Sequence, residues 1–134
     1  MVSYRTGNNL ELDAVIDLYR ASTLGLRRPV DDRSRMEQML RNANLVITAW
    51  DGDLLVGISR SFTDFSYATY LSDLAVRESH QRRGIGKELI RRTQAQSAPA
   101  AIILLAAPAA ELYYPHIGFT HHPQAWILRP ERSI

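Results

Sequence analysis

The sequence contains no cysteine, which excludes a disulfide framework, a thiolate metal site and a cysteine nucleophile. Its four histidines do not pair at a metal-ligand spacing, so we expect no metal. No apolar run is long enough to span a membrane. The N-terminus has a lone Arg5 and lacks the apolar stretch of a secretory signal. We therefore expect a cytoplasmic protein with no membrane partner.

The excess of positive charge is small, with a formal net charge of +2 and a pI near 9.2. The basic residues gather in one place, at Arg82, Arg83, Lys87, Arg91 and Arg92. Part of this group suits a polyphosphate, and part has the pattern of a solvated helix face. No aromatic residues interleave with it, as stacking on single-stranded nucleic acid would require. We predict no nucleic-acid partner and keep nucleic-acid binding as the weakest hypothesis.

The length and composition are those of one globular domain. A chain of 134 residues can bury about two thirds of the surface that it exposes when unfolded. Hydrophobic residues make up 46% and charged residues 22%, which is ordinary for a soluble protein. We expect a single domain over 1–134 that ends in a loose tail at 129–134.

The first half of the chain predicts one strand at 2–5, two helices and an antiparallel meander. Apolar runs at 45–50, 54–60 and 67–76 predict the meander, and Asp51-Gly52 is a strong hairpin signal. Two apolar stripes at helical spacing each follow a capping residue: Leu12, Val15, Ile16 and Tyr19 after Asn8 or Asn9, and Met36, Met39, Leu40 and Ala43 after Asp31 or Asp32.

The second half predicts a parallel crossover. A helix with Ile85, Leu89 and Ile90 facing inward leads to a continuous apolar strand at 101–106, expected in a buried central position. A short helix should run from Pro108 to about residue 116. A final hairpin should follow, and its apolar last strand at 126–128 could pair across a homodimer. The order β-α-α-β-β-β-α-β-α-β predicts an α/β fold with a mixed, mostly antiparallel sheet flanked by helices.

A glycine-rich loop between the third strand of the meander and the next helix has the layout of an anion site. Glycine lets the backbone approach a ligand closely, and the first N–H groups of a helix have no internal partner. Other phosphate loops fail on spacing. Gly86-Lys87 is followed by Glu88 where an ATP-binding loop needs Ser or Thr, and Leu89 stands where a dinucleotide loop needs glycine.

Two motifs together resemble one family. Gln81-Arg82-Arg83-Gly84-Ile85-Gly86 is similar to the Gln/Arg-x-x-Gly-x-Gly/Ala motif of the GCN5-related N-acetyltransferase (GNAT) superfamily. The segment at 110–119, AELYYPHIGF, is similar to that family's Ala-x-x-Phe/Leu-Tyr-x-x-x-Gly-Phe helix. The resemblance covers the order of elements from near the start to about Leu128, and it implies the GNAT (acyl-CoA N-acyltransferase) fold.

The resemblance also implies how acetyl-CoA would be held as co-substrate. The backbone amides from Arg82 to Lys87 would hold the pyrophosphate, and the side chains of Arg82 and Arg83 could also reach the nucleotide phosphate. The preceding strand would pair its backbone with the pantetheine arm, because in the family it splays from the next strand. The cofactor-binding residues implied in this way are Leu74, Ala75, Val76, Gln81, Arg82, Arg83, Gly84, Ile85, Gly86 and Lys87.

Tyr114 occupies the family's general-acid position, where it could protonate the departing thiolate. Tyr113 stands where the family has Phe or Leu, so we interpret it as packing. The general base stays open between Asp73, a histidine and water, because the base positions used in the family fall on Ser72 and Tyr70. His80 is better explained as a solvated loop residue.

The acceptor cannot be named from the sequence. The resemblance places the stretch at 22–30 against the acceptor pocket, where Arg27 and Arg28 could meet an acidic group or simply be exposed. The leading hypothesis is an N-acetyltransferase acting on a primary amine of a small molecule, peptide or protein by direct attack in a ternary complex. The alternative is a non-catalytic acyl-CoA sensor or regulatory module, which the missing acidic base and Ala107, in place of a common Asn, would suit.

Overall fold

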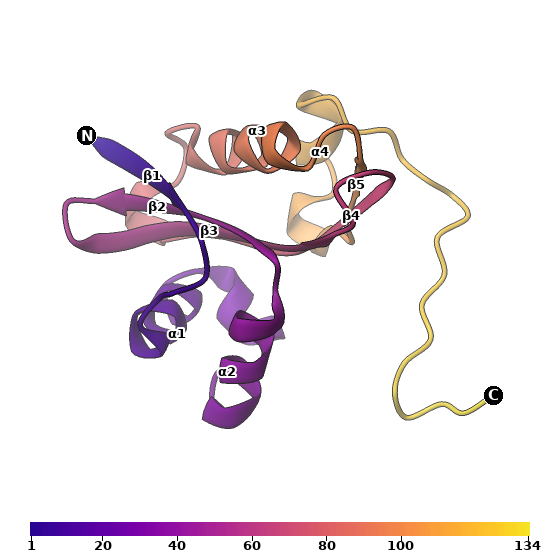
Figure 1. The fold of residues 1–134 in the computed structure, drawn as a ribbon, viewed down its shortest axis with the longest axis horizontal. Coiled ribbons are helices and arrows are strands. Elements are labelled where there is room, and N and C mark those ends of the chain that lie inside the picture. Colours follow the sequence, from indigo (N-terminus) through magenta and orange to yellow (C-terminus); the bar gives the residue numbers. More distant parts are fainter.

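The computed structural model describes all residues from Met1 to Ile134 as one mixed sheet covered by helices on both faces (Figure 1). The sheet has the spatial order β1-β2-β3-β4-β5, in which the first four strands are antiparallel neighbours and the fifth pairs parallel with the fourth. This confirms the predicted fold class and the parallel crossover. The strands are β1 (Val2–Thr6), β2 (Leu45–Asp51), β3 (Leu54–Thr63), β4 (Ala68–Val76) and β5 (Ala101–Ile103).

The helices form two layers. The four α-helices are α1 (Leu12–Arg20), α2 (Arg33–Asn42), α3 (Ile85–Ser97) and α4 (Tyr113–His116), and three 3₁₀ turns are η1 (Thr23–Arg27), η2 (Glu78–His80) and η3 (Pro108–Ala110). Figure 1 shows α1 and α2 on one face of the sheet and α3 on the other. None of these helices combines the length and the apolar character that crossing a bilayer requires.

The sheet divides the core into two clusters. On β2, Val46 packs with the apolar stripes of α1 and α2, while its neighbours Leu45 and Ile47 pack with Ile85 and Leu89 of α3. This alternation is the period of two that a strand buried on both faces must show. The stripes predicted for both helices are therefore confirmed, and the Asp51-Gly52 hairpin turns between β2 and β3 with Gly52 at a φ of 59°.

The two helix caps have different outcomes. Asp32 caps α2, because its carboxylate accepts a hydrogen bond from the Arg35 amide at 3.1 Å. The cap predicted for α1 is wrong, since Glu11 precedes that helix and contributes no side-chain bond. Asn8 instead donates to the carbonyls of residues 40, 41 and 43 at the end of α2. A helix end leaves carbonyls without partners, and the packing of the chain brings this amide to them.

Three predictions for the C-terminal part differ from the structure. The run at 101–106 forms only the three-residue edge strand β5, and Ile103 and Leu105 are about half exposed, because no strand covers its outer side. The predicted hairpin with a strand at 126–128 does not form, and the chain beyond α4 extends away from the body (Figure 1). The predicted helix at 108–116 divides into η3 and α4, since Pro115 has no N–H to donate to residue 111.

Candidate functional site

The outer edge of β4 is open over its second half. Strand β5 pairs only with Ala68, Thr69 and Tyr70, whereas β4 continues to Val76. Ser72 is the extra residue of a bulge, because Arg60 and Ser61 of β3 pair with residues 73 and 71. The segment from 71 to 76 therefore has sheet hydrogen bonds on its β3 side only, and an extended ligand with amide groups could add to the free side as a further strand.

The glycine loop that follows presents unused donors. None of the backbone N–H groups from Arg82 to Lys87 donates a hydrogen bond within the protein. The backbone is left-handed at Arg82, with a φ of 64°, and at Gly84, with a φ of 78°, immediately before α3. When left-handed residues are interspersed in a loop in this way, successive backbone N–H groups point to the same side. The dipole of α3 adds positive potential at that point. The loop is thus built to receive an anion such as a phosphate.

Two side chains fix this loop to the sheet. Gln81 donates to the Val76 carbonyl at 3.0 Å, and Nε2 of His80 lies 2.8 Å from a carboxylate oxygen of Asp51 at the end of β2. The hydrogen bond with His80 lowers the pKa of Asp51. The interpretation of His80 as a solvated residue is wrong, because its ring is buried between the loop and the β2–β3 hairpin. Local sequence gives no signal of this pairing, which joins residues 29 positions apart.

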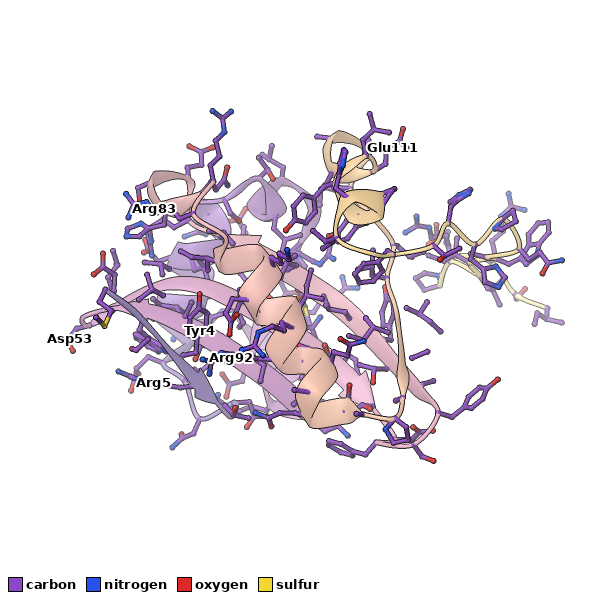
Figure 2. All side chains as sticks on the ribbon, turned by 90° about the horizontal axis from the view of Figure 1, so that it is seen from above. Tyr4, Arg5, Asp53, Arg83, Arg92 and Glu111 are labelled. Atoms are coloured by element: carbon purple, nitrogen blue, oxygen red, sulfur yellow. The ribbon has the colours of Figure 1, made fainter.

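The positive charge of α3 is only partly neutralised. Glu88 pairs with Arg91 at 2.6 Å and Arg92 at 2.7 Å, and the hydrogen bonds from these two guanidinium groups lower its pKa to about 2. Arg92 also lies over the ring of Tyr4 on β1, at 4.5 Å from its centre (Figure 2). Arg82, Arg83 and Lys87, by contrast, form no ion pair. Figure 2 places Arg83 in the loop before α3, so its unpaired guanidinium is carried by the same segment as the unbonded backbone N–H groups.

A pocket of about 120 Å³ lies beside the open edge of β4. Its walls come from η1 and the residues around it, from β4, and from the segment between β5 and α4. A wider and more open hollow of about 420 Å³ lies near the connection 98–100, away from these groups. The smaller pocket is lined by Thr23, Leu24, Arg27, Arg28, Leu71, Ser72, Leu74, Leu104, Leu105, Ala107, Ala110 and Tyr114.

Tyr114 reaches this pocket from α4, with its ring 5.3 Å from those of Tyr113 and Phe119 in edge-to-face contacts. Burial, and then the charge of Tyr113, raise the pKa of Tyr114. Its phenol is therefore protonated at neutral pH and can donate a proton. Tyr113, interpreted above as a packing residue, does contact the ring of Tyr114. Its hydroxyl group also approaches the glycine loop, because a Cβ added at Gly86 would lie 3.8 Å from its oxygen.

Asp73 is an internal ion-pair centre and is unsuited to act as a base. Its buried carboxylate accepts hydrogen bonds from Tyr19 at 2.6 Å, Arg60 at 2.6 Å, Arg28 at 2.7 Å and Ser72 at 3.1 Å. Burial alone would raise the pKa of Asp73, but the hydrogen bond and charge of Arg60, followed by the charge of Arg28, lower it overall. Neither the long-range pairing nor its arginine partners could be predicted from local sequence.

No aspartate, glutamate or histidine lines the pocket. His116, His121 and His122 are exposed on or after α4, and His80 is bound to the β2–β3 hairpin. Of the bases that the sequence left open, water is the one that this pocket leaves room for. The structure brings the open edge of β4 and Tyr114 together in this pocket, and the glycine loop lies next to them, with Gly86 close to Leu74, Val76 and Tyr113.

The fold and these two motifs are those of an acetyltransferase. The family model described as acetyltransferase (GNAT) domain matches residues 23–126, which is more than half of the chain. The chain therefore belongs to the GNAT family of acetyltransferases. No curated protein matches the sequence.

Solved structures share the fold over nearly the whole chain. A GNAT-family acetyltransferase from Streptococcus pneumoniae TIGR4 is 26% identical, with a TM-score of 0.77, and the match covers 96% of this chain and 99% of that one. The aminoglycoside N-acetyltransferase AAC(6')-Iy in complex with CoA is 17% identical, with a TM-score of 0.75 and coverage of 98% and 96%. An aminoglycoside acetyltransferase from an uncultured soil metagenomic sample is 23% identical, with a TM-score of 0.70 and coverage of 96% and 94%.

Proposed function

We propose that this chain is an acetyl-CoA-dependent N-acetyltransferase that acts on a primary amine of a small molecule or peptide. The observation that carries the proposal is the meeting of three features: the free amides from Arg82 to Lys87, the open edge of β4 and the protonated phenol of Tyr114. Together they match a ligand with a pyrophosphate at one end, an amide-rich arm in the middle and a thioester at the other end.

Each part of the site has a role in this proposal. The free amides and the side chains of Arg82, Arg83 and Lys87 bind the phosphates. The backbone of Leu74, Ala75 and Val76 pairs with the pantetheine arm along the open edge. Acetyl-CoA supplies the activated acetyl group.

The chemistry needs few protein groups. Tyr114 donates its phenolic proton to the sulfur as the carbon–sulfur bond breaks and the carbon–nitrogen bond forms. The proton lost by the amine leaves through water, since no carboxylate or imidazole lines the pocket. Direct attack suits a chain without cysteine, because no covalent enzyme intermediate is needed.

The test is calorimetric titration of acetyl-CoA into the wild-type protein and Gly84→Asp. A carboxylate beside the phosphate donors should weaken binding at least about tenfold through charge repulsion. Gly7→Asp is the matched control, because Gly7 also has a positive φ, of 128°, and an added Cβ there also has no heavy atom within 4 Å. Its amide donates to the Val46 carbonyl, at the other end of β2 from Asp51 and the loop. Equal affinity in both variants, with both folded, would contradict the assignment of the glycine loop; no binding by the wild type would contradict the proposed co-substrate.

A non-catalytic acyl-CoA sensor is the second candidate. It is favoured by the lack of an acidic or histidine side chain in the pocket and by Ala107 on its wall. Release of free coenzyme A in the presence of a broad amine panel, followed with a thiol reagent, distinguishes the two. Tight binding of acetyl-CoA with no transfer to any amine would support the sensor.

A further inference from the structure

The wall of the pocket formed by η1 carries two arginines with different roles. Arg28 is fully engaged: it donates to the Asp73 carboxylate at 2.7 Å, to the Ser72 carbonyl at 2.8 Å and to the Arg27 carbonyl at 2.8 Å. Arg27 lines the same pocket, yet its guanidinium makes no hydrogen bond and no ion pair. One arginine therefore belongs to the fold, and the other is free for a ligand.

The backbone that carries Arg27 is held in place. Arg28 bonds to its carbonyl, and the Ser22 hydroxyl accepts from the Leu24 amide to cap η1. Gly25 packs so closely on the end of α1 that an added Cβ would lie 2.7 Å from the Tyr19 carbonyl oxygen. The fold thus fixes the backbone of Arg27, while its exposed guanidinium can adjust to what it binds.

The electrostatics of the pocket are positive. Arg27 and Arg28 line it and no acidic residue does, and the one buried carboxylate behind the wall, Asp73, is already shared by Arg28 and Arg60. An ammonium ion close to this charge loses its proton more readily than in water, because a nearby like charge disfavours the charged form. The same field attracts a carboxylate and repels a second ammonium group.

We propose that the acceptor is a small amine that also carries a carboxylate, an amino acid or a close analogue, and that Arg27 binds its carboxylate. The proposal rests on the proposed acetyltransferase function. Arg27, Ser72 and Tyr114 line the same pocket, so one small molecule can have its carboxylate at η1 and its amine beside the bulge of β4. With the carboxylate on Arg27, the excess positive charge of Arg28 and Arg60 over Asp73 would still favour the neutral amine that attack requires. A polycationic acceptor does not fit this charge pattern.

The first test compares free amino acids with their carboxamides as acceptors. The paired compounds have nearly the same shape and differ in one charge. The carboxamide also has the α-amine of lower pKa, so a preference for the carboxylate cannot come from easier loss of the amine proton. The wild type should show a kcat/KM higher for the carboxylate by about tenfold or more. Arg27→Gln should remove this preference and Arg27→Lys should keep part of it, with acetyl-CoA affinity unchanged in both. Arg35→Gln is the matched control, because Arg35 is exposed on α2 and its side chain makes no interaction. Equal use of carboxamides, or faster acetylation of a polyamine, overturns the inference.

The second test does not depend on turnover. The same amino acids and carboxamides are titrated into protein saturated with coenzyme A, with binding followed by saturation-transfer NMR. Binding that needs the carboxylate and falls in Arg27→Gln supports the inference even if no acetyl transfer is found, in which case only the catalytic proposal fails. Binding of neither compound, or equal binding of both, overturns it.

Discussion

At the residue scale, the buried carboxylate of Asp73 joins elements that are distant in the sequence. It receives Tyr19 from α1, Arg28 from the residue after η1 and Arg60 from β3. Removing one partner of a buried ion pair leaves the other charges uncompensated, which typically costs more than the pair contributes. The stability of the wall at η1 and that of the sheet therefore depend on one ionised group.

We expect Asp73→Asn to lower the free energy of unfolding by about 3–5 kcal/mol at pH 7. The pKa of Asp73 is lowered on folding, so its contribution is complete above the unfolded value of about 3.9 and is lost as the pH falls through the folded value. The difference between wild type and variant should thus shrink below about pH 4. Urea unfolding at pH 7 and pH 3 measures it, with Asp31→Asn as the control, since Asp31 pairs with Arg20 on the surface. Equal losses in the two variants would contradict a central role for Asp73.

Tyr114→Phe tests the proposed general acid. We expect kcat to fall by about 100-fold while the affinity for acetyl-CoA is retained. Burial raises the pKa of Tyr114 above the usual value of a phenol, so loss of this proton should not lower the wild-type kcat between pH 7 and 9.5. Single-turnover rates across this range check both points. Tyr67→Phe, at an exposed tyrosine remote from the pocket lining, is the control; an unchanged kcat in Tyr114→Phe would exclude the role.

At the scale of elements, the packing of α3 on the sheet sets where the glycine loop lies. Gly57 of β3 faces this helix, and a Cβ there would lie 3.1 Å from side-chain atoms of both Ile85 and Leu89. We expect Gly57→Ala to displace the start of α3, to cost about 1–3 kcal/mol of stability and to weaken coenzyme A binding several-fold. Thermal unfolding and calorimetry measure the two effects. Leu89→Ala in the same background should relieve one of these two contacts and restore part of the affinity. An unaltered affinity in Gly57→Ala would contradict the coupling.

Elements whose signal is local were predictable, and those that depend on distant partners were not. The stripes of α1 and α2 and the Asp51-Gly52 hairpin follow from spacing and turn chemistry. The short length of β5 and the lack of a strand at 126–128 do not, because an apolar run becomes a strand only where a neighbouring strand pairs with it. The same division holds in the site. The glycine loop and Tyr114 belong to local sequence motifs, whereas the pairs Arg28–Asp73 and His80–Asp51 join residues far apart in the sequence and form only when the chain folds.

At the scale of the whole molecule, the C-terminal segment lies apart from the body (Figure 1). Trp126 is 94% exposed, whereas Trp50 is partly buried with Arg5 4.3 Å from its ring centre. We expect acrylamide to quench the fluorescence of Trp126 efficiently, and Trp126→Phe to leave a less accessible emission from Trp50. If acrylamide failed to quench the fluorescence of Trp126 in dilute wild-type protein, the exposed position of this segment would be contradicted. Quenching that decreases as protein concentration rises would indicate that copies of the chain bury the segment between them.

The contrast between Arg27 and Arg28 has a consequence for how acceptor preference can evolve. Arg28 makes three hydrogen bonds that the fold uses, so a change there alters the sheet, the wall and the buried carboxylate together. Arg27 makes none with its side chain, so a single substitution can change the charge of the pocket without a loss of stability to be compensated elsewhere. The proposed selectivity position and the structural position are adjacent in sequence, yet a substitution at the first leaves the hydrogen bonds of the second in place, so one residue is free to diversify under selection.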